Sequence, residues 1–212
     1  LDFLDASSFG AAKGGKRIDT HASMVFLGGD RALKIKRAVR LPFLDYSTLE
    51  KRKRACEEEL RVNAGNAPEL YRRVVAITRS SDGAFEIDGT GPPVEWAVEM
   101  TRFDDNQSLD RVAVSKIIEP PLATDVADAI LRSHVHAPRA DGESWLASIR
   151  PIIERNTVKF RSVRGLDAVA VDRLDAASRD AATTLQPLLG QRAGQGFVRR
   201  CHGDLHLANI AL

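Results

Sequence analysis

The hydrophobic period of the sequence changes near residue 100, and this change restricts the possible folds more than any other feature. Before it, short apolar and β-branched runs alternate with Gly- and Asp-rich turns, as in antiparallel strands. The expected strands are 23–27, 31–36, 70–79, 84–87 and 94–100, and one helix, 48–63, interrupts them. From Leu109 onward the apolar residues recur at helical spacing. The sequence therefore predicts an α+β protein.

The same patterns predict two lobes joined by a short connector. Residues 1–100 would form a β-rich lobe, 101–105 a hinge that follows Glu99 and Met100, and 106–212 a mostly helical lobe. Helices are expected at 124–136, at 143–160 with a kink at Pro151, and at 167–189. Ser47 with Glu50 would cap the helix at 48–63, and 10–16 would be a flexible lead-in. A cleft between two such lobes is a common ligand site.

Composition excludes several classes of function. The net charge of +2 gives no general attraction to nucleic acid or membranes, and no apolar run reaches the ~18 residues that span a bilayer. Cys56 and Cys201 have no metal-ligand spacing and are too few for a disulfide scaffold, which suits a reducing cytoplasm. Because the chain starts at Leu1 and stops at Leu212, directly after an apparent functional motif, we expect it to be a piece of a longer polypeptide.

That motif is His202–Asn209, which with one Gly-for-Arg change is the catalytic-loop pattern H-R-D-L-x-x-x-N. In the pattern an Asp accepts the proton of a hydroxyl nucleophile and an Asn binds magnesium. Asp204 and Asn209 hold these positions, with His202 at the start, and short strands are expected at 197–198 and 209–212. A simple turn, in which Gly relaxes the backbone and Asp caps the next segment, is the alternative.

The expected strand 31–36 carries a second candidate group. Ala32, Lys34 and Lys36 share one face of it, and a small residue beside a lysine suits a nucleotide, because one leaves room for a base and the other reaches phosphates. An edge strand guarded by lysines is the alternative. A glutamate of the following helix would hold Lys34. Glu59 is preferred because it adjoins the apolar stripe of this helix. Glu58 is the next choice, and Glu57 is the third candidate.

Two other polar groups are better explained without a ligand. The basic run Lys51–Arg54 is expected to be a solvated face paired with the glutamates at 57–59. Nucleic-acid binding through this run or through 34–40 is disfavoured, because no aromatic residues are interleaved with the charges. His134 and His136 are two apart in a helix, so they face different directions and do not suggest a metal site.

Taken together, the sequence resembles the aminoglycoside phosphotransferase (APH)-like branch of the protein-kinase-like fold. It is most similar to bacterial domains of this kind that are joined to a C-terminal P-loop ATPase domain. The resemblance rests on Asp19–Ser23, Val25–Leu27, Leu33–Lys36, Phe43–Arg52, Glu57–Arg61, Val94–Val98 and His202–Asn209. It implies a two-lobed APH-type fold whose helical lobe is truncated here.

The resemblance also implies roles for single residues. Lys34 would hold the phosphates of ATP and Glu59 would hold Lys34, while Asp204 would be the catalytic base and Asn209 would bind Mg²⁺. Thr20 and Ser23, in a loop without the G-x-G-x-x-G of protein kinases, would cover the phosphates together with backbone amides of the loop. Ala32 would adjoin the base, and the connector from Glu99 and Met100 would receive its edge. The second acidic Mg²⁺ ligand would lie beyond Leu212.

The function expected from this resemblance is phosphoryl transfer from ATP to a hydroxyl group of a small molecule in the bacterial cytoplasm. The acceptor cannot be read from the sequence, since Asp104, Asp105, Asp110, Asp141 and Glu143 form no obvious acidic cluster for a cationic one. Without its second acidic ligand, the chain alone would bind ATP weakly and transfer little. The alternative is a non-catalytic nucleotide-binding or regulatory module of a larger protein with a P-loop ATPase domain.

Overall fold

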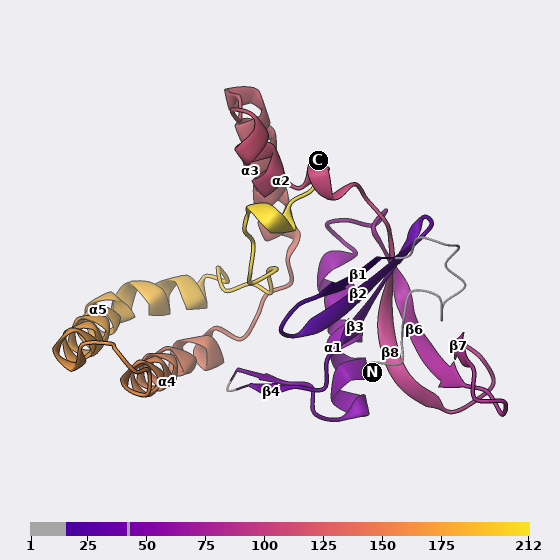
Figure 1. Ribbon diagram of the computed structural model, residues 1–212. Coiled ribbons are helices and arrows are strands. Elements are labelled where there is room, and N and C mark those ends of the chain that lie inside the picture. Colours follow the sequence, from indigo (N-terminus) through magenta and orange to yellow (C-terminus); the bar gives the residue numbers. More distant parts are fainter. Residues whose placement is uncertain (1–15, 42) are drawn as a thin grey trace. The chain divides into compact units, whose positions relative to one another are not determined.

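The computed structural model describes residues 16–41 and 43–212, which fall into two compact units (Figure 1). The first unit contains the described residues up to Asp128 together with His202–Leu212, and the second contains Ala129–Cys201. These units divide the chain at other points than the hinge expected at 101–105, and the expected lobes stay a prediction. Most of the expected lead-in, 10–15, lies outside the described residues.

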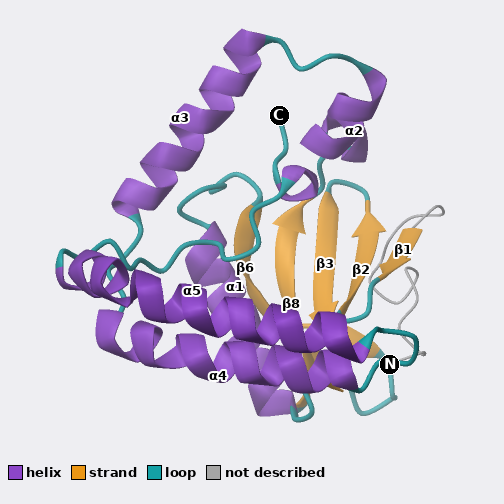
Figure 2. Ribbon diagram, turned by 90° about the vertical axis from the view of Figure 1, so that its left-hand side faces the viewer, coloured by secondary structure: helices purple, strands orange, loops and turns teal. Residues whose placement is uncertain are grey.

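A six-stranded antiparallel sheet forms the centre of the first unit, in the order β1-β2-β3-β8-β6-β7 (Figure 2). The strands are β1 (Lys16–Asp19), β2 (Ser23–Gly28), β3 (Arg31–Lys36), β6 (Tyr71–Arg79), β7 (Phe85–Ile87) and β8 (Pro93–Thr101). With the helices that follow, this sheet confirms the α+β class. Strand β1 was not predicted, because Ile18 is its only apolar residue and its partner β2 supplies the pairing.

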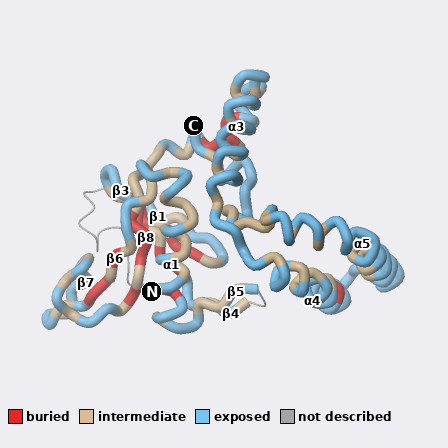
Figure 3. The backbone as a smooth tube through the Cα atoms, turned by 180° about the vertical axis from the view of Figure 1, so that it is seen from behind, coloured by how far each residue is buried: buried red, intermediate tan, exposed pale blue. Residues whose placement is uncertain are grey.

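One face of this sheet carries the apolar core of the unit. Leu33 and Ile35 point to that face, while Ala32, Lys34 and Lys36 alternate to the other. The buried core residues are Met24, Phe26, Leu33, Ile35, Val75, Ile77 and Ala97. Figure 3 shows buried residues concentrated in the strands of this sheet.

The helix α1 (Leu49–Asn63) packs on β8, β6 and β3. Its N-cap is Thr48, whose side chain accepts a hydrogen bond from the backbone N–H of Lys51. The expectation that Ser47 caps the helix was therefore wrong by one residue. The Ser47 hydroxyl instead donates to Asp45, which belongs to a small two-stranded sheet of β4 (Arg40–Leu41) and β5 (Leu44–Asp45).

The basic run at the start of α1 is only partly a solvated face. Three of its members form ion pairs near the surface, Lys51 with Asp45, Lys53 with Glu57 and Arg54 with Glu50. Arg52 is buried, and its Nε lies 2.8 Å from Oε1 of Glu95 in β8. Of the expected pairings with the glutamates at 57–59, the one between Lys53 and Glu57 is present.

The end of the chain joins the first unit through α2 (Leu109–Ser115), which follows the short helix η2 (Asp105–Gln107). The N–H of Leu109 donates to Ile210 and the N–H of Leu212 to Gln107. The strand expected at 209–212 is reduced to an isolated bridge between Ser108 and Ala211, after the 3-10 helix η3 (Leu207–Asn209). The strand expected at 197–198 is likewise absent. An isolated bridge instead joins the next residue, Arg199, to Arg139.

The remaining helices are α3 (Pro120–His136), which crosses the boundary between the units, α4 (Gly142–Arg161) and α5 (Ala168–Gly194). In the second unit α4 and α5 lie side by side (Figures 1 and 2), and the buried hydroxyl of Thr157 donates to Asp175 at 2.7 Å between them. Helix α3 starts before the expected Thr124, and α5 runs past Pro187 to Gly194. Among the described residues, no helix is both long and apolar enough to cross a membrane.

Candidate functional site

Lys34 of β3 and Glu59 of α1 form an ion pair across the interface of strand and helix. Nζ of Lys34 lies 2.7 Å from Oε1 of Glu59, and the two side chains are 31% and 11% exposed. Among the three neighbouring glutamates, Glu59 is the partner of Lys34, while Glu57 pairs with Lys53 and Glu58 with Arg61. The structure thus brings together the two residues that the sequence analysis favoured.

Lys36 enters the same site, although the sequence analysis gave it no role. Its Nζ contacts Oε2 of Glu59, its side chain is only 8% exposed, and the ring of Tyr46 lies 5.7 Å from the ammonium group. The signal in the sequence was the alternation of Lys34 and Lys36 on one face of the strand. Two ammonium groups therefore share one carboxylate, and the cluster of Lys34, Lys36 and Glu59 has a surplus of one positive charge.

Glu59 is ionised in this cluster. Burial raises the pKa of its carboxyl, but Lys34 and Lys36 together lower it by more, so the pKa lies below the usual 4.5. The neighbouring acids behave differently, since burial raises the pKa of the Cys56 thiol and of the Tyr71 hydroxyl to about 12. Burial also raises the pKa of Tyr46. These three groups are neutral at physiological pH, so the surplus positive charge remains.

The turn between β1 and β2 lies at the Lys36 end of β3, because Lys36 pairs with Ser23. Thr20 does not present a free hydroxyl there, since its Oγ1 accepts from the N–H of Ser23 at 2.9 Å and contacts the Ser23 carbonyl oxygen. Ser23 is itself buried. Within the described residues, the N–H groups of His21 and Ala22 donate no hydrogen bond. Of the side chains and backbone amides expected to cover the phosphates, the amides are therefore the groups this turn offers to an anion.

Glu99 and Met100 do not belong to the connector, because β8 continues to Thr101. Both lie between β3 and β6, where a central strand commits its backbone groups to the sheet. Ala32 pairs with Met100 and is only 6% exposed, so it offers little free surface. The connector can start only after Thr101.

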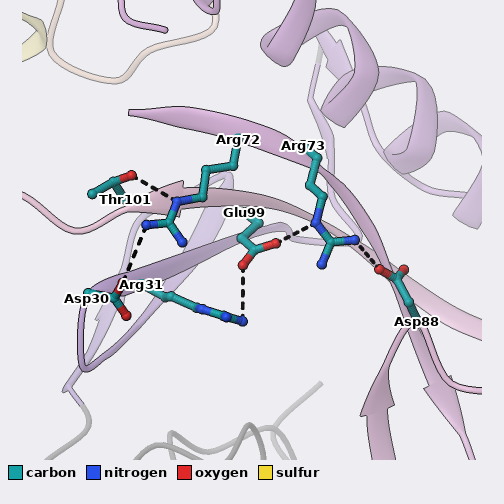
Figure 4. A network of polar contacts seen from close by, with 7 residues as sticks. All are labelled: Asp30, Arg31, Arg72, Arg73, Asp88, Glu99 and Thr101. Carbon is teal, nitrogen blue, oxygen red and sulfur yellow. Dashed lines mark hydrogen bonds and ion pairs between the residues drawn. The ribbon is translucent and has the colours of Figure 1, made fainter. Parts of the chain in front are cut away.

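The side chain of Glu99 belongs to a network of arginines on the sheet face opposite Lys34 (Figure 4). Its two oxygens lie 3.3 Å from Arg31 and 2.8 Å from Arg73, and Arg73 also binds Asp88. The carboxylate is 4% exposed, whereas both arginines are more than half exposed. Glu99 therefore holds three strands together.

A cavity of about 500 Å³ lies where β8 passes into the connector. Gly29 and Asp30 of the β2–β3 turn line it together with residues 102–106, Lys16 and Arg111. The N–H of Arg102 donates to Asp30 and that of Thr101 to Leu70, so both amides are occupied. The first connector residues with N–H groups available to a ligand at this cavity come after Arg102.

The motif 202–209 forms an exposed loop whose polar groups contact one another. Gly203 has a φ of +81°, a conformation that disfavours the arginine of the general pattern. Nδ2 of Asn209 donates to the carbonyl oxygen of Asp204 at 2.8 Å and lies 3.1 Å from Nε2 of His206. Nδ1 of His202 accepts from the N–H of Asp204. The Asp204 carboxylate is 81% exposed and therefore accessible.

The predicted site residues thus form two groups, the lysine cluster and the loop. Both groups belong to the first compact unit, although they are far apart in the sequence. Across the described part of the chain, no hydrogen bond or ion pair joins Lys34 or Glu59 to Asp204 or Asn209. Nor do the described residues contain a group of three or more His, Cys, Asp or Glu side chains that could hold a metal ion.

The fold and the site define an α+β protein in which a helix supplies one carboxylate to two lysines of an antiparallel sheet. No protein-family model and no solved structure matches the chain. It is similar to mycobacterial proteins, among them Mb2027c of Mycobacterium bovis and MT2060 and Rv2004c of Mycobacterium tuberculosis, each described as uncharacterized. Each is 25% identical over 199 residues, or 92% of this chain, and the chain spans only 38% of the length of these relatives.

Proposed function

We propose that this chain is the ATP-binding part of a phosphotransferase that moves the γ-phosphoryl group of ATP to a hydroxyl group of a small molecule. The observation that carries the proposal is the surplus positive charge of the cluster Lys34, Lys36 and Glu59. A partly buried surplus cation is stabilised by an anion. Lys34 is the more exposed of the two lysines and can reach a phosphate. Phosphates of a nucleotide fit this requirement.

The turn at His21 and Ala22 would add backbone N–H groups to the phosphate site. Amides that point into a turn bind anions without a charged side chain. Since the amides of Thr101 and Arg102 are already occupied, the base would contact the connector after Arg102, at the cavity lined by 102–106. This differs from the contacts at Glu99 and Met100 expected from the sequence.

The exposed loop would supply the chemistry. The Asp204 carboxylate is exposed, with Nε2 of His206 3.8 Å from its Oδ2, and would accept the proton of an attacking hydroxyl. Nδ2 of Asn209 is held by the Asp204 carbonyl oxygen, which leaves Oδ1 as a possible ligand for a hard cation. Asn209 thus could supply one ligand to a magnesium ion. Bound Mg²⁺ would neutralise charge on the phosphate oxygens.

The second candidate is a non-catalytic nucleotide-binding module of a larger protein. Two observations favour it. No hydrogen bond or ion pair joins the loop to the lysine cluster within the described residues, and the curated relatives are much longer than the chain. In either case we propose a bacterial cytoplasmic protein with a covalently linked P-loop ATPase domain and with no nucleic-acid or membrane partner.

Exchange of Asp204 to Ala in the full-length protein separates the two candidates. Transfer from ATP with a radiolabelled γ-phosphate to a small-molecule extract would be measured beside ATP affinity. An enzyme loses at least about a hundredfold in transfer while its ATP affinity changes little. Ser148→Ala, at a half-buried position of α4 in the second unit, is the control. ATP binding without any Asp204-dependent product would favour the binding module, and absence of ATP binding would exclude both.

A further inference from the structure

The two lysines that share Glu59 are not equivalent. Lys34 approaches Oε1 and is 31% exposed, whereas Lys36 approaches Oε2 and is 8% exposed. The ring of Tyr46 also lies near the Lys36 ammonium group. Lys36 is therefore fixed in the interior, while Lys34 has access to solvent and to a ligand.

This difference matters when an anion arrives. With Lys34 as its sole partner, Glu59 would lose that partner each time Lys34 turned to a phosphate, and an unpaired carboxylate would remain in the interior. Such a buried charge is costly, so the phosphate would have to compete with Glu59 for Lys34. The contact between Lys36 and Oε2 of Glu59 removes this competition, because the carboxylate stays paired.

We propose that Lys36 is a positioning residue that keeps Glu59 fixed and charged, so that Lys34 can exchange Glu59 for a phosphate of ATP. The inference rests on the proposed ATP site and adds to it a residue to which the sequence analysis gave no role. It also distinguishes the two lysines, since Lys34 contacts the ligand and Lys36 acts through Glu59.

The groups around Glu59 allow a test through pH. Those that face it are Lys34 and Lys36 from β3, Tyr46 from the segment before α1, Cys56 from α1 and Tyr71 from β6. Since the acids among them are neutral at physiological pH, Glu59 is the group in the cluster that gains a proton as the pH falls. With Lys36 removed, one lysine alone opposes the effect of burial, so the pKa of Glu59 rises.

The experiment measures ATP affinity by calorimetry for the full-length wild type and for Lys36→Met between about pH 4 and pH 8. At neutral pH the variant should bind about tenfold more weakly, because ionised Glu59 then competes for Lys34. The titration of ATP itself affects both affinities equally and therefore cancels from their ratio. This ratio should approach one as Glu59 becomes protonated. Lys36→Arg keeps the charge and should follow the wild type, as should Lys51→Met, which removes an exposed lysine.

An affinity ratio that is close to one at neutral pH, or that is the same at all pH values, would overturn the proposal. A separate NMR titration of the Glu59 carboxyl without ATP distinguishes this failure from failure of the proposed function. The pKa should lie below 4.5 in the wild type and higher in Lys36→Met. If the wild type does not bind ATP, the proposed function fails, and an unchanged Glu59 pKa in Lys36→Met would show independently that Lys36 does not control Glu59.

Discussion

Glu59 holds more of the proposed site together than any other residue, because it joins α1 to both lysines of β3. Glu59→Gln keeps the shape but leaves Lys34 and Lys36 without a charged partner, so we expect a loss of about 3 kcal/mol in the free energy of unfolding at neutral pH. Urea unfolding measures this loss. Glu50→Gln, which removes an exposed pair with Arg54, is the control and should cost less than about 0.5 kcal/mol.

The same comparison has a defined pH dependence. The folded pKa of Glu59 lies below its usual value of 4.5, so the carboxylate stabilises the fold fully above pH 4.5, and this contribution is lost as the pH falls through the lower folded pKa. The stability difference between the wild type and Glu59→Gln should therefore shrink in acid. A difference that is constant down to about pH 3 would contradict the assigned charge.

Glu99 is the residue with the largest change of role between sequence and structure. Its buried carboxylate binds two arginines, and Glu99→Gln should lower stability by about 2 kcal/mol, less than for a fully buried pair because both arginines are half exposed. Its effect on ATP affinity should be less than about twofold. Asp30→Asn, in an exposed pair with Arg72, serves as the control for stability. A large loss of ATP affinity with unchanged stability in Glu99→Gln would instead support the role of Glu99 in nucleotide binding that the sequence suggested.

At the scale of elements, the start of α1 gives a direct test of the structure against the sequence pattern. Thr48 is the N-cap, so Thr48→Ala should cost about 1 kcal/mol, whereas Ser47→Ala should cost less than half of that. Denaturant unfolding of both variants decides between the two positions. The opposite order would favour the capping box of Ser47 and Glu50 that the sequence suggested.

Sequence patterns predicted the elements whose signals are local. The β2–β3 hairpin follows from its apolar runs and from a turn whose Gly29 has a φ of +55°, and α1 follows from its period. Strand β1 was missed because its pairing with β2, rather than its composition, makes it a strand. The burial of Arg52 could not be predicted either, since its partner Glu95 is far away in the sequence.

At the scale of the whole molecule, the sequence predicted one pairing of the proposed site but not how its other residues lie. The pairing of Lys34 with Glu59 follows from the order of strand and helix, but the contact of Lys36 with the second oxygen depends on how α1 packs on the sheet. The sequence placed Glu99 at the connector, whereas it lies within β8. The end of this strand is set by its pairing with β3 and β6, and such pairing cannot be predicted from the composition near residue 100. How the lysine cluster and the loop meet around a ligand stays a prediction.

A further prediction concerns the activity of the 212-residue chain by itself. Its loop offers one candidate magnesium ligand, the Oδ1 atom of Asn209. We therefore expect weak ATP binding and little phosphoryl transfer, measured by calorimetry and by release of the γ-phosphate. Turnover above about 1 per second, within the usual range of kinases, would contradict this expectation.

The central claim is that Lys34, Asp204 and Asn209 act on the same triphosphate. A crystal structure of the full-length protein with Mg²⁺ and a non-hydrolysable ATP analogue would show whether they do. We expect Nζ of Lys34 to lie within hydrogen-bonding distance of a phosphate oxygen, while Lys36 remains paired with Glu59. Oδ1 of Asn209 should coordinate the metal bound to the same nucleotide. A nucleotide bound away from Lys34, or a loop that points to another face of the molecule, would contradict it.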